Sequence, residues 1–342
     1  MTSEELYIQM KQKLSDVVPD FELREKAKLA WEINQLKEEK NAVILGHNYM
    51  EPALFHSIPD YTGDSLELSR IAAKTDKDII VFCGVEFMAE TAKILSPEKT
   101  VLIPSQKAGC SLASSITAED VRILKKQFPG VPVVTYVNTY ADVKAETDVC
   151  CTSGNAAAVV ESLNSDVVIF LPDEFLAKNV AKETGKKIIF PTPGEKISSD
   201  LDYQLIGWKG RCEVHEKFTT EDIINVRKQF PDVVVLSHPE CSPEVVSESD
   251  FSGSTSAMIK YVENTSAPRY LLLTECSMGD NIVAANPEKE LLRLCSVRCP
   301  HMNQITLEDT FNALINIQYE VHVPEDIRVR AARAVQRMIE IS

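Results

Sequence analysis

A short pattern occurs three times in this chain and limits its possible folds more than any other feature. It consists of a cysteine, six further residues, a threonine, one residue and then Glu-Asp. Threonine followed three residues later by aspartate, just before a helical apolar pattern, is typical of a helix start. A unit that places one thiol at the same point each time can bring three thiols to one centre. The copies run from Cys110 to Thr117, from Cys212 to Thr219 and from Cys299 to Thr306.

The chain around these copies repeats in the same register. Residues 116–138 match residues 218–240 almost without gaps, and both segments contain Lys-Gln-Phe-Pro at the same offset. The first block begins in the same way, because a helical pattern leads into the apolar run 42–46 and then into His47. Internal repeats of this kind indicate one structural unit that is used several times.

Short continuous apolar runs bounded by turn residues are typical of buried parallel strands. Helical patterns lie between these runs, for example at 66–74, 156–163 and 257–262. This alternation predicts parallel sheets covered by helices. The fold class that we predict is α/β, with three homologous three-layer α/β/α units arranged about a pseudo-threefold axis. The expected strands are 42–46, 78–83 and 100–104 in the first unit, 131–137, 166–171 and 187–190 in the second, and 233–237, 269–274 and 290–295 in the third.

The repeat also predicts domain limits. The first unit is expected over residues 1–115, with a helical lead near 22–39, and the second and third over 116–211 and 212–299. Two helices within 300–342, at 307–319 and 326–339, are expected to return and complete the first unit. Residues 191–208 are rich in Pro, Gly, Ser and Asp, which predicts an excursion loop, either a lid or a surface insertion.

Charge and hydropathy exclude several classes of partner. The formal net charge is −15 without a basic run, which argues against nucleic acid or an anionic membrane. No segment approaches the ~18 apolar residues of a membrane span, and residues 1–40 contain no signal-peptide core. We therefore expect a cytoplasmic protein whose nine cysteines are reduced. A cysteine with a special role is then a metal ligand or a catalytic group.

Polar side chains stand at the end of the first expected strand of every block, where open parallel sheets collect their ligands. One such pair could be helix capping or ordinary loop polarity, but three coincident pairs favour a shared site. The pairs are His47 and Tyr49, Tyr136 and Asn138, and His238 and Glu240.

The helices that come next start with small residues and hydroxyls, which suit anion binding because free amides and the helix dipole point outward there. Ordinary N-capping is the alternative explanation. Three such helix starts on one axis would form a pocket for a small polyanion. Their sequences are Gly63-Asp64-Ser65, Ser153-Gly154-Asn155 and Gly253-Ser254-Thr255.

Three thiolates without a fourth protein thiol leave one metal position open, as in catalytic sites. They suit zinc or an iron–sulfur cluster, and a four-iron cluster held this way has one iron free as a Lewis acid. Cys295 and Cys299 could instead form a local ligand pair, but the repeat register favours Cys299 and leaves Cys295 as a buried thiol. We expect the adjacent Cys150 and Cys151 to pack in a loop.

As a set, the motifs of this chain resemble the quinolinate synthase family (quinolinate synthetase A proteins), from about Ala30 to the end. The long 191–208 loop departs from that family. The motifs that carry the resemblance are Gly46-His-Asn-Tyr49, Gly63-Asp-Ser-Leu66, Cys83-Gly-Val, Phe87-Met-Ala-Glu-Thr-Ala-Lys93, Gly109-Cys110, Tyr136-Val-Asn138, Cys151-Thr-Ser153, Cys212-Glu-Val-His215, His238-Pro-Glu-Cys241, Gly253-Ser-Thr255 and Cys299-Pro300.

The resemblance implies three stacked α/β domains and a 4Fe–4S cluster on Cys110, Cys212 and Cys299. It implies condensation of iminoaspartate with dihydroxyacetone phosphate to quinolinate, phosphate and water in NAD biosynthesis, and makes the enzyme that supplies iminoaspartate a candidate partner. Glu240 is our hypothesis for the main acid/base, assisted by Tyr49 and His238. The implied substrate-binding residues are His47, Ser65, Tyr136, Asn138, Ser153, His238, Glu240 and Thr255.

Two other classes could use the same thiols. An iron–sulfur redox or oxygen sensor would use the exposed cluster as a signal, but the chain lacks a basic DNA-reading helix. A zinc hydrolase is the second alternative, although such enzymes usually recruit histidine and carboxylate ligands.

Overall fold

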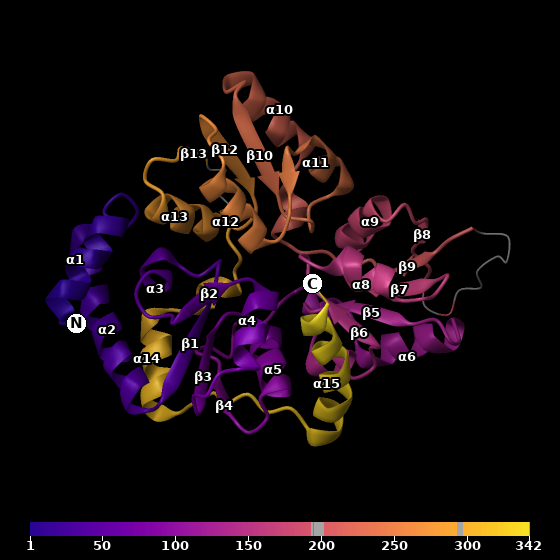
Figure 1. The fold of residues 1–342 in the computed structure, drawn as a ribbon, viewed down its shortest axis with the longest axis horizontal. Helices are drawn as coiled ribbons and strands as arrows, with labels where there is room; N and C mark the ends of the chain where they lie inside the picture. The colour runs from indigo at the N-terminus through magenta and orange to yellow at the C-terminus, as the bar shows by residue number, and fades with distance from the viewer. Residues whose placement is uncertain (193, 195–201, 293–296, 342) are drawn as a thin grey trace.

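The computed structural model describes residues 1–192, 194, 202–292 and 297–341. Figure 1 shows three α/β units packed around a common centre, each with its own sheet and flanking helices. Every strand pairing within the described residues is parallel except for an isolated bridge between Leu102 and Glu320. The predicted fold class is therefore confirmed. None of the described helices is long and apolar enough to cross a membrane.

The first and third sheets have the same topology. Their strand orders are β2-β1-β3-β4 and β11-β10-β12-β13, so corresponding strands occupy corresponding places. The first sheet consists of β1 (Ala42–His47), β2 (Tyr61–Gly63), β3 (Ile79–Cys83) and β4 (Thr100–Leu102). The third consists of β10 (Val233–Ser237), β11 (Phe251–Ser252), β12 (Arg269–Leu273) and β13 (Leu291–Leu292).

The second sheet extends this order by one strand, as β6-β5-β7-β9-β8. The strand predicted at 187–190 is present, but the place equivalent to β4 is taken by β9, which lies inside the predicted excursion loop. The predicted strand forms β8, an additional edge strand. Gly207 permits this arrangement, because a Cβ there would overlap the Phe190 ring. The strands are β5 (Val133–Tyr136), β6 (Val149–Cys151), β7 (Val168–Leu171), β8 (Ile188–Ile189) and β9 (Leu205–Gly207).

Three edge strands were not expected from the sequence, namely β2, β6 and β11. Each has two or three residues and pairs with a single neighbour, which is too short for a recognisable apolar run. Cys150 and Cys151 belong to β6 and are fully buried, so the prediction that they pack in a loop is wrong. Residues 193 and 195–201 of the expected loop, and Cys295, lie outside the described residues.

The predicted helix starts after the repeated cysteines are confirmed. The Thr117 hydroxyl accepts from the amide of Asp120 at 3.3 Å, and the other two threonines cap their helices in the same way. A short 3₁₀ turn precedes each helix: η1 (Ala113–Ser115), η2 (His215–Lys217) and η3 (Met302–Gln304). The helices that follow are α6 (Ala118–Gln127), α10 (Thr220–Gln229) and α14 (Leu307–Asn316).

The remaining helices cover the sheets, and the ends of the chain pack on the first unit. Helix α14 contacts α2 and β3, whereas α15 lies across the seam between α5 of the first unit and β6 and α7 of the second (Figure 1). The helical lead consists of α1 (Ser3–Leu14) and α2 (Asp20–Glu39). The others are α3 (Pro52–Phe55), α4 (Ser65–Ala72), α5 (Glu86–Leu95), α7 (Ala141–Lys144), α8 (Ala156–Ser162), α9 (Glu174–Glu183), α11 (Pro243–Glu248), α12 (Thr255–Asn264), α13 (Cys276–Ala285) and α15 (Glu325–Glu340).

Candidate active site

A cavity lies at the carboxyl ends of the central strands and is lined by residues from all three units. Strand β1 ends at His47, β5 ends at Tyr136, and His238 follows directly after β10. The structure brings every site residue predicted from the sequence to this cavity. These residues are His47, Tyr49, Ser65, Cys110, Tyr136, Asn138, Ser153, Cys212, His238, Glu240, Thr255 and Cys299.

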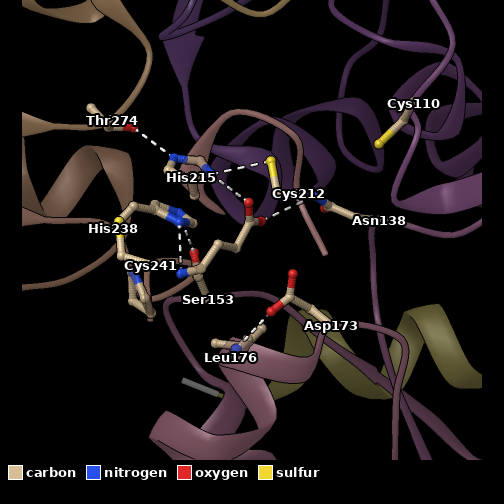
Figure 2. Close-up of polar contacts among 12 residues, drawn as sticks. Cys110, Asn138, Ser153, Asp173, Leu176, Cys212, His215, His238, Cys241 and Thr274 are labelled. Atoms are coloured by element: carbon tan, nitrogen blue, oxygen red, sulfur yellow. Dashed lines mark hydrogen bonds and ion pairs between the residues drawn. The ribbon is translucent and has the colours of Figure 1, made fainter. Parts of the chain in front are cut away.

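Both carboxylate oxygens of Glu240 take part in hydrogen bonds inside the cavity. Its Oε1 accepts from the Tyr136 hydroxyl at 2.5 Å. The same oxygen accepts from the Asn138 amide at 3.3 Å, and Oε2 lies 2.7 Å from Nδ1 of His215 (Figure 2). Burial by itself raises the pKa of Glu240. The charges of His215 and His238 and the hydrogen bonds with His215 and Tyr136 together lower the pKa by a larger amount. The net shift of the pKa is downward, so Glu240 is a carboxylate at neutral pH.

His215 extends this network on its other side. Its Nε2 lies 3.0 Å from the Thr274 hydroxyl, which is 2.5 Å from the hydroxyl of Tyr49. The Nδ1 atom also lies 3.2 Å from Sγ of Cys212. Burial and the charge of Glu240 raise the pKa of Tyr49 well above its usual value, so its phenol stays protonated. A continuous chain of hydrogen bonds therefore joins Tyr49 to the carboxylate of Glu240.

Sequence reasoning gave no role to His215, Thr274 or Asp173. His215 does belong to the motif Cys212-Glu-Val-His215, so its position three residues after a repeated cysteine was an available signal. Thr274 follows β12 directly, at the same sheet edge as the other site residues. For Asp173, the only local signal was its place before an expected helix.

Asp173 is a second buried acid, close enough to Glu240 to be affected by its charge. It is 0% exposed, and its Oδ1 caps α9 by accepting from the Leu176 amide at 2.6 Å (Figure 2). Its Oδ2 has no hydrogen-bond partner among the residues that the structure describes. Burial, and after it the charge of Glu240, raises the pKa of Asp173 well above its usual value. The pKa values of the two buried acids are therefore shifted in opposite directions.

The three predicted anion-binding hydroxyls are not the residues that cap the helices. Asp64 caps α4, and Ser254 caps α12, so the hydroxyls of Ser65 and Thr255 are not used for ordinary N-capping. The hydroxyl of Ser153 lies 3.2 Å from Nε2 of His238. The capping alternative therefore does not account for these hydroxyls, and all three face the same cavity.

The three repeated cysteines share one local geometry. The carbonyl of each accepts from the amide four residues later, at 3.0 Å for Cys110, 3.0 Å for Cys212 and 3.2 Å for Cys299. Burial raises the pKa of Cys110 to about 12, that of Cys299 to about 11 and that of Cys212 well above its usual value. Backbone amides two and three residues after each cysteine act in the opposite direction.

These turns suit thiolates that bind a metal centre, because hydrogen bonds to the sulfurs are typical of iron–sulfur sites. A second donor set overlaps with them, since ligand atoms of Cys212, His215 and Glu240 lie within 4.8 Å of one another. The described part of the chain therefore contains a candidate metal site. The other described cysteines are Cys83, Cys150, Cys151 and Cys241, which are buried, and the half-buried Cys276.

Three parallel-sheet units that converge on a cavity lined by thiols, imidazoles, phenols and hydroxyls define a triplicated α/β enzyme with a candidate metal centre. The family model described as "Quinolinate synthetase A protein" matches residues 31–340. The chain belongs to this family.

Curated relatives match over nearly the whole chain. Quinolinate synthase 2 of Mesorhizobium japonicum is 54% identical over 309 residues, which cover 90% of this chain and 90% of the relative. Quinolinate synthase of Sinorhizobium fredii is 52% identical over 330 residues, 96% of this chain and 87% of the relative. Quinolinate synthase of Caulobacter vibrioides is 51% identical over 334 residues, 96% of this chain and 86% of the relative.

Proposed function

We propose that this chain is a quinolinate synthase that condenses iminoaspartate with dihydroxyacetone phosphate in NAD biosynthesis. The products are quinolinate, one phosphate and two waters. The observation that carries the proposal is the convergence of three equivalent cysteine turns and three hydroxyls on one cavity, in a chain of this family. Reduced cysteines support action in the cytoplasm, and the enzyme that forms iminoaspartate is the proposed partner.

Anion binding is the first task of the site, because both substrates carry negative charge. Ser65 and Thr255 are the first residues of α4 and α12, where free amides and the helix dipole favour anions. Asn48 donates to the Thr255 hydroxyl at 2.9 Å, so the hydrogen of that hydroxyl is free to turn to a ligand. Local backbone amides can thus bind anions in a protein whose net charge is −15.

Proton transfer is the second task, because the condensation removes a proton from the carbon of iminoaspartate that forms the new bond. The Glu240 carboxylate is ionised at neutral pH and is the proposed base. His215 holds one of its oxygens through Nδ1, and Tyr136 holds the other. Tyr49 reaches the same carboxylate through Thr274 and His215 and is the proposed acid for a departing hydroxyl.

Cys110, Cys212 and Cys299 are the proposed ligands of a 4Fe–4S cluster. When bound, such a cluster supplies a Lewis acid, because three thiolates on four irons leave one iron open to a substrate oxygen or nitrogen.

The decisive experiment is an anaerobic assay with protein whose iron and sulfide contents have been measured. Iminoaspartate and dihydroxyacetone phosphate should give quinolinate and an equal amount of phosphate, and omission of either substrate should abolish both. Absence of quinolinate with protein that contains iron and sulfide would overturn the proposal. Zinc in place of iron and sulfide would favour a zinc enzyme that uses Cys212, His215 and Glu240.

A further inference from the structure

An asparagine of the second unit holds the turn that follows the central strand of the third unit. This turn consists of residues 238–241 and carries Glu240. Nδ2 of Asn179, on α9, donates to the carbonyls of Pro239 and Cys241 at 2.8 and 3.0 Å. Both hydrogens of one side-chain amide are therefore used across the boundary between the two units.

An asparagine of the third unit makes the same contact with the first unit. The corresponding turn there consists of residues 47–50 and carries Tyr49. Nδ2 of Asn281, on α13, donates to the carbonyls of Asn48 and Met50 at 3.2 and 2.9 Å. This second amide is buried, and it too uses both hydrogens on a neighbouring unit.

The two contacts are equivalent in the repeat. Each asparagine is the sixth residue after the residue that caps its helix, which is Asp173 for α9 and Glu275 for α13. In both turns the carbonyls belong to the first and third residues after the histidine. The two helices lie at boundaries between units, because α9 packs against α11 and α13 packs against α3 (Figure 1). One helical position therefore contacts the same two backbone atoms at two boundaries.

We infer that Asn179 and Asn281 are positioning residues, each of which fixes the turn of a neighbouring unit that carries a proposed acid/base group. The contacts themselves stand on the hydrogen bonds. The importance of the two turns, with the base Glu240 and the acid Tyr49, rests on the proposed function. The geometry of the cavity is then set by contacts between units as well as by the fold of each unit.

The orientation of both amides follows from what they contact. A carbonyl oxygen only accepts hydrogen bonds, so the amide nitrogen must face the two carbonyls, and the reverse orientation would place Oδ1 against two acceptors. Oδ1 of Asn179 and Oδ1 of Asn281 are buried and have no hydrogen-bond partner within the described residues. Each side-chain amide is therefore held through Nδ2, and a substitution that removes Nδ2 removes the contact.

The third boundary, between the first and second units, uses other groups. The sixth residue after the cap of α5 is Thr91, whose hydroxyl donates to a carbonyl of its own helix at 2.7 Å. Its neighbour Glu90 accepts from the amide of Ala141 in the second unit at 2.8 Å. The carbonyl of Thr139, the third residue after β5, accepts from Lys144 of its own unit. We therefore expect the asparagine contacts to act on the turns of the first and third units only.

The contact of Asn281 continues toward the proposed anion site. The carbonyl of Asn48 accepts from Asn281, and the side chain of Asn48 donates to the Thr255 hydroxyl at 2.9 Å. Thr255 belongs to the third unit, as Asn281 does, so this path crosses the boundary and returns. Loss of Asn281 should therefore disturb Thr255 as well as the turn. Loss of Asn179 should act mainly on Glu240.

Hydrogen–deuterium exchange of anaerobic protein, read by mass spectrometry, tests the contacts directly. Asn179→Ala should speed exchange of the backbone amides of Glu240 and Cys241 by about tenfold, as expected when two hydrogen bonds are lost, and should leave the turn at 47–50 unchanged. Asn281→Ala should show the reverse pattern. A change confined to α9 or α13, or one that is equal in both turns, would overturn the inference.

Asn286→Ala is the matched control. Its amide donates at 3.0 Å to the carbonyl of Ile282 on the same helix, so the substitution removes a similar bond without crossing a boundary. Thermal unfolding should first show that each variant is folded. Asn179→Ser and Asn281→Ser, which also lack Nδ2, replace an alanine variant that does not fold. If neither substitution at a position folds, that residue supports the fold as a whole and its positioning role is wrong.

Kinetics test the functional part separately. Asn179→Ala should lower kcat by about 10- to 100-fold with little change in KM, because a displacement of about 1 Å in an active site can cost about 10²-fold in rate. Asn281→Ala should also raise KM, because Thr255 belongs to the proposed anion site. Values equal to those of Asn286→Ala would overturn the role of the contacts in catalysis. Failure of quinolinate formation in the unmodified protein would remove the kinetics but leave the exchange result, so the two proposals fail separately.

Discussion

Nδ1 of His215 lies 2.7 Å from Oε2 of Glu240 and 3.2 Å from Sγ of Cys212. One imidazole therefore joins a proposed metal ligand to the proposed base. The contact depends on the repeat, because His215 begins the 3₁₀ turn after Cys212 and Glu240 stands at the mouth of β10 in the same unit. A single side chain therefore contacts both the Cys212 thiol and the Glu240 carboxylate.

Glu240→Gln should reduce kcat by about 10²–10⁴-fold, the usual contribution of a positioned general base. Glutamine keeps the shape and can still accept from Tyr136, so the iron and sulfide contents should not change. The measurement is the anaerobic rate of quinolinate formation. Glu244→Gln is the matched control, because it makes the same change at an exposed position on α11. An unreduced rate in the Glu240→Gln enzyme would show that Glu240 is not the general base.

Cys→Ala at Cys110, Cys212 or Cys299 should abolish the cluster, because each thiolate is one of three ligands and no other side chain replaces it in the repeat. The measurements are iron and sulfide contents and the visible absorption spectrum of anaerobically purified protein. The same substitution at Cys83, Cys241, Cys276 or Cys295 should leave the cluster in place. Retention of the cluster after Cys299→Ala, or its loss after Cys295→Ala, would mean that the register identified the wrong cysteine.

The parts that could be predicted from the sequence depend on local patterns that are repeated. The threonine caps, the central strands β1, β5 and β10 and the polar residues at their mouths each recur at a fixed spacing, so three copies reinforce one another. The convergence of the site follows from them, because the carboxyl ends of equivalent strands face the same centre. This is why all twelve predicted site residues line one cavity.

The parts that could not be predicted depend on contacts across long separations in sequence. Strand β11 has only two residues and exists because β10 lies beside it. Strand β9 lies in a segment whose Pro, Gly, Ser and Asp content predicted a loop and gave no sign of a strand. The roles of His215 and Thr274 appear only when η2 and the end of β12 bring them together with Tyr49 from another unit. No local periodicity contains that information.

Asp173 should make the protein less stable as the pH rises. An acid whose pKa is lowered by folding has the opposite effect. The pKa of this buried carboxyl is raised in the folded state, so the folded protein holds a proton that the unfolded chain releases above about pH 4. Its contribution to stability is therefore complete below that pH and is lost as the pH rises toward the folded pKa. Asp173→Asn resembles the neutral acid and still accepts from Leu176.

Thermal unfolding at about pH 5 and 8 tests this sign. The melting temperature of Asp173→Asn relative to the unmodified protein should rise between the two pH values, with both proteins in the same cluster state. Asp166→Asn, which changes an exposed aspartate, should show no such trend. A relative decrease for Asp173→Asn at the higher pH would mean that the native carboxyl is ionised.

The last prediction concerns Asn155, which ties the end of α15 to the loop that carries Ser153. Its Oδ1 accepts from the amide and the hydroxyl of Thr152 at 2.8 and 3.2 Å, and its Nδ2 donates to the carbonyls of Met338 and Ile341 at 3.1 and 2.9 Å. Asn155→Asp keeps the acceptor but turns a second oxygen toward two carbonyls. Because the site is buried, this should cost about 1–3 kcal/mol of unfolding free energy.

The same substitution should raise KM more than it lowers kcat, because Ser153 belongs to the proposed anion site and not to the acid/base pair. The fold should survive, since Arg70 still donates to the carbonyl of Ile339 at 3.0 Å and holds the end of α15 to the first unit. Asn264→Asp is the matched control, because its amide also donates to a backbone carbonyl, at 2.8 Å, but at an exposed position. Equal effects of Asn155→Asp and Asn264→Asp on KM and on denaturant unfolding would show that α15 does not position the Ser153 loop.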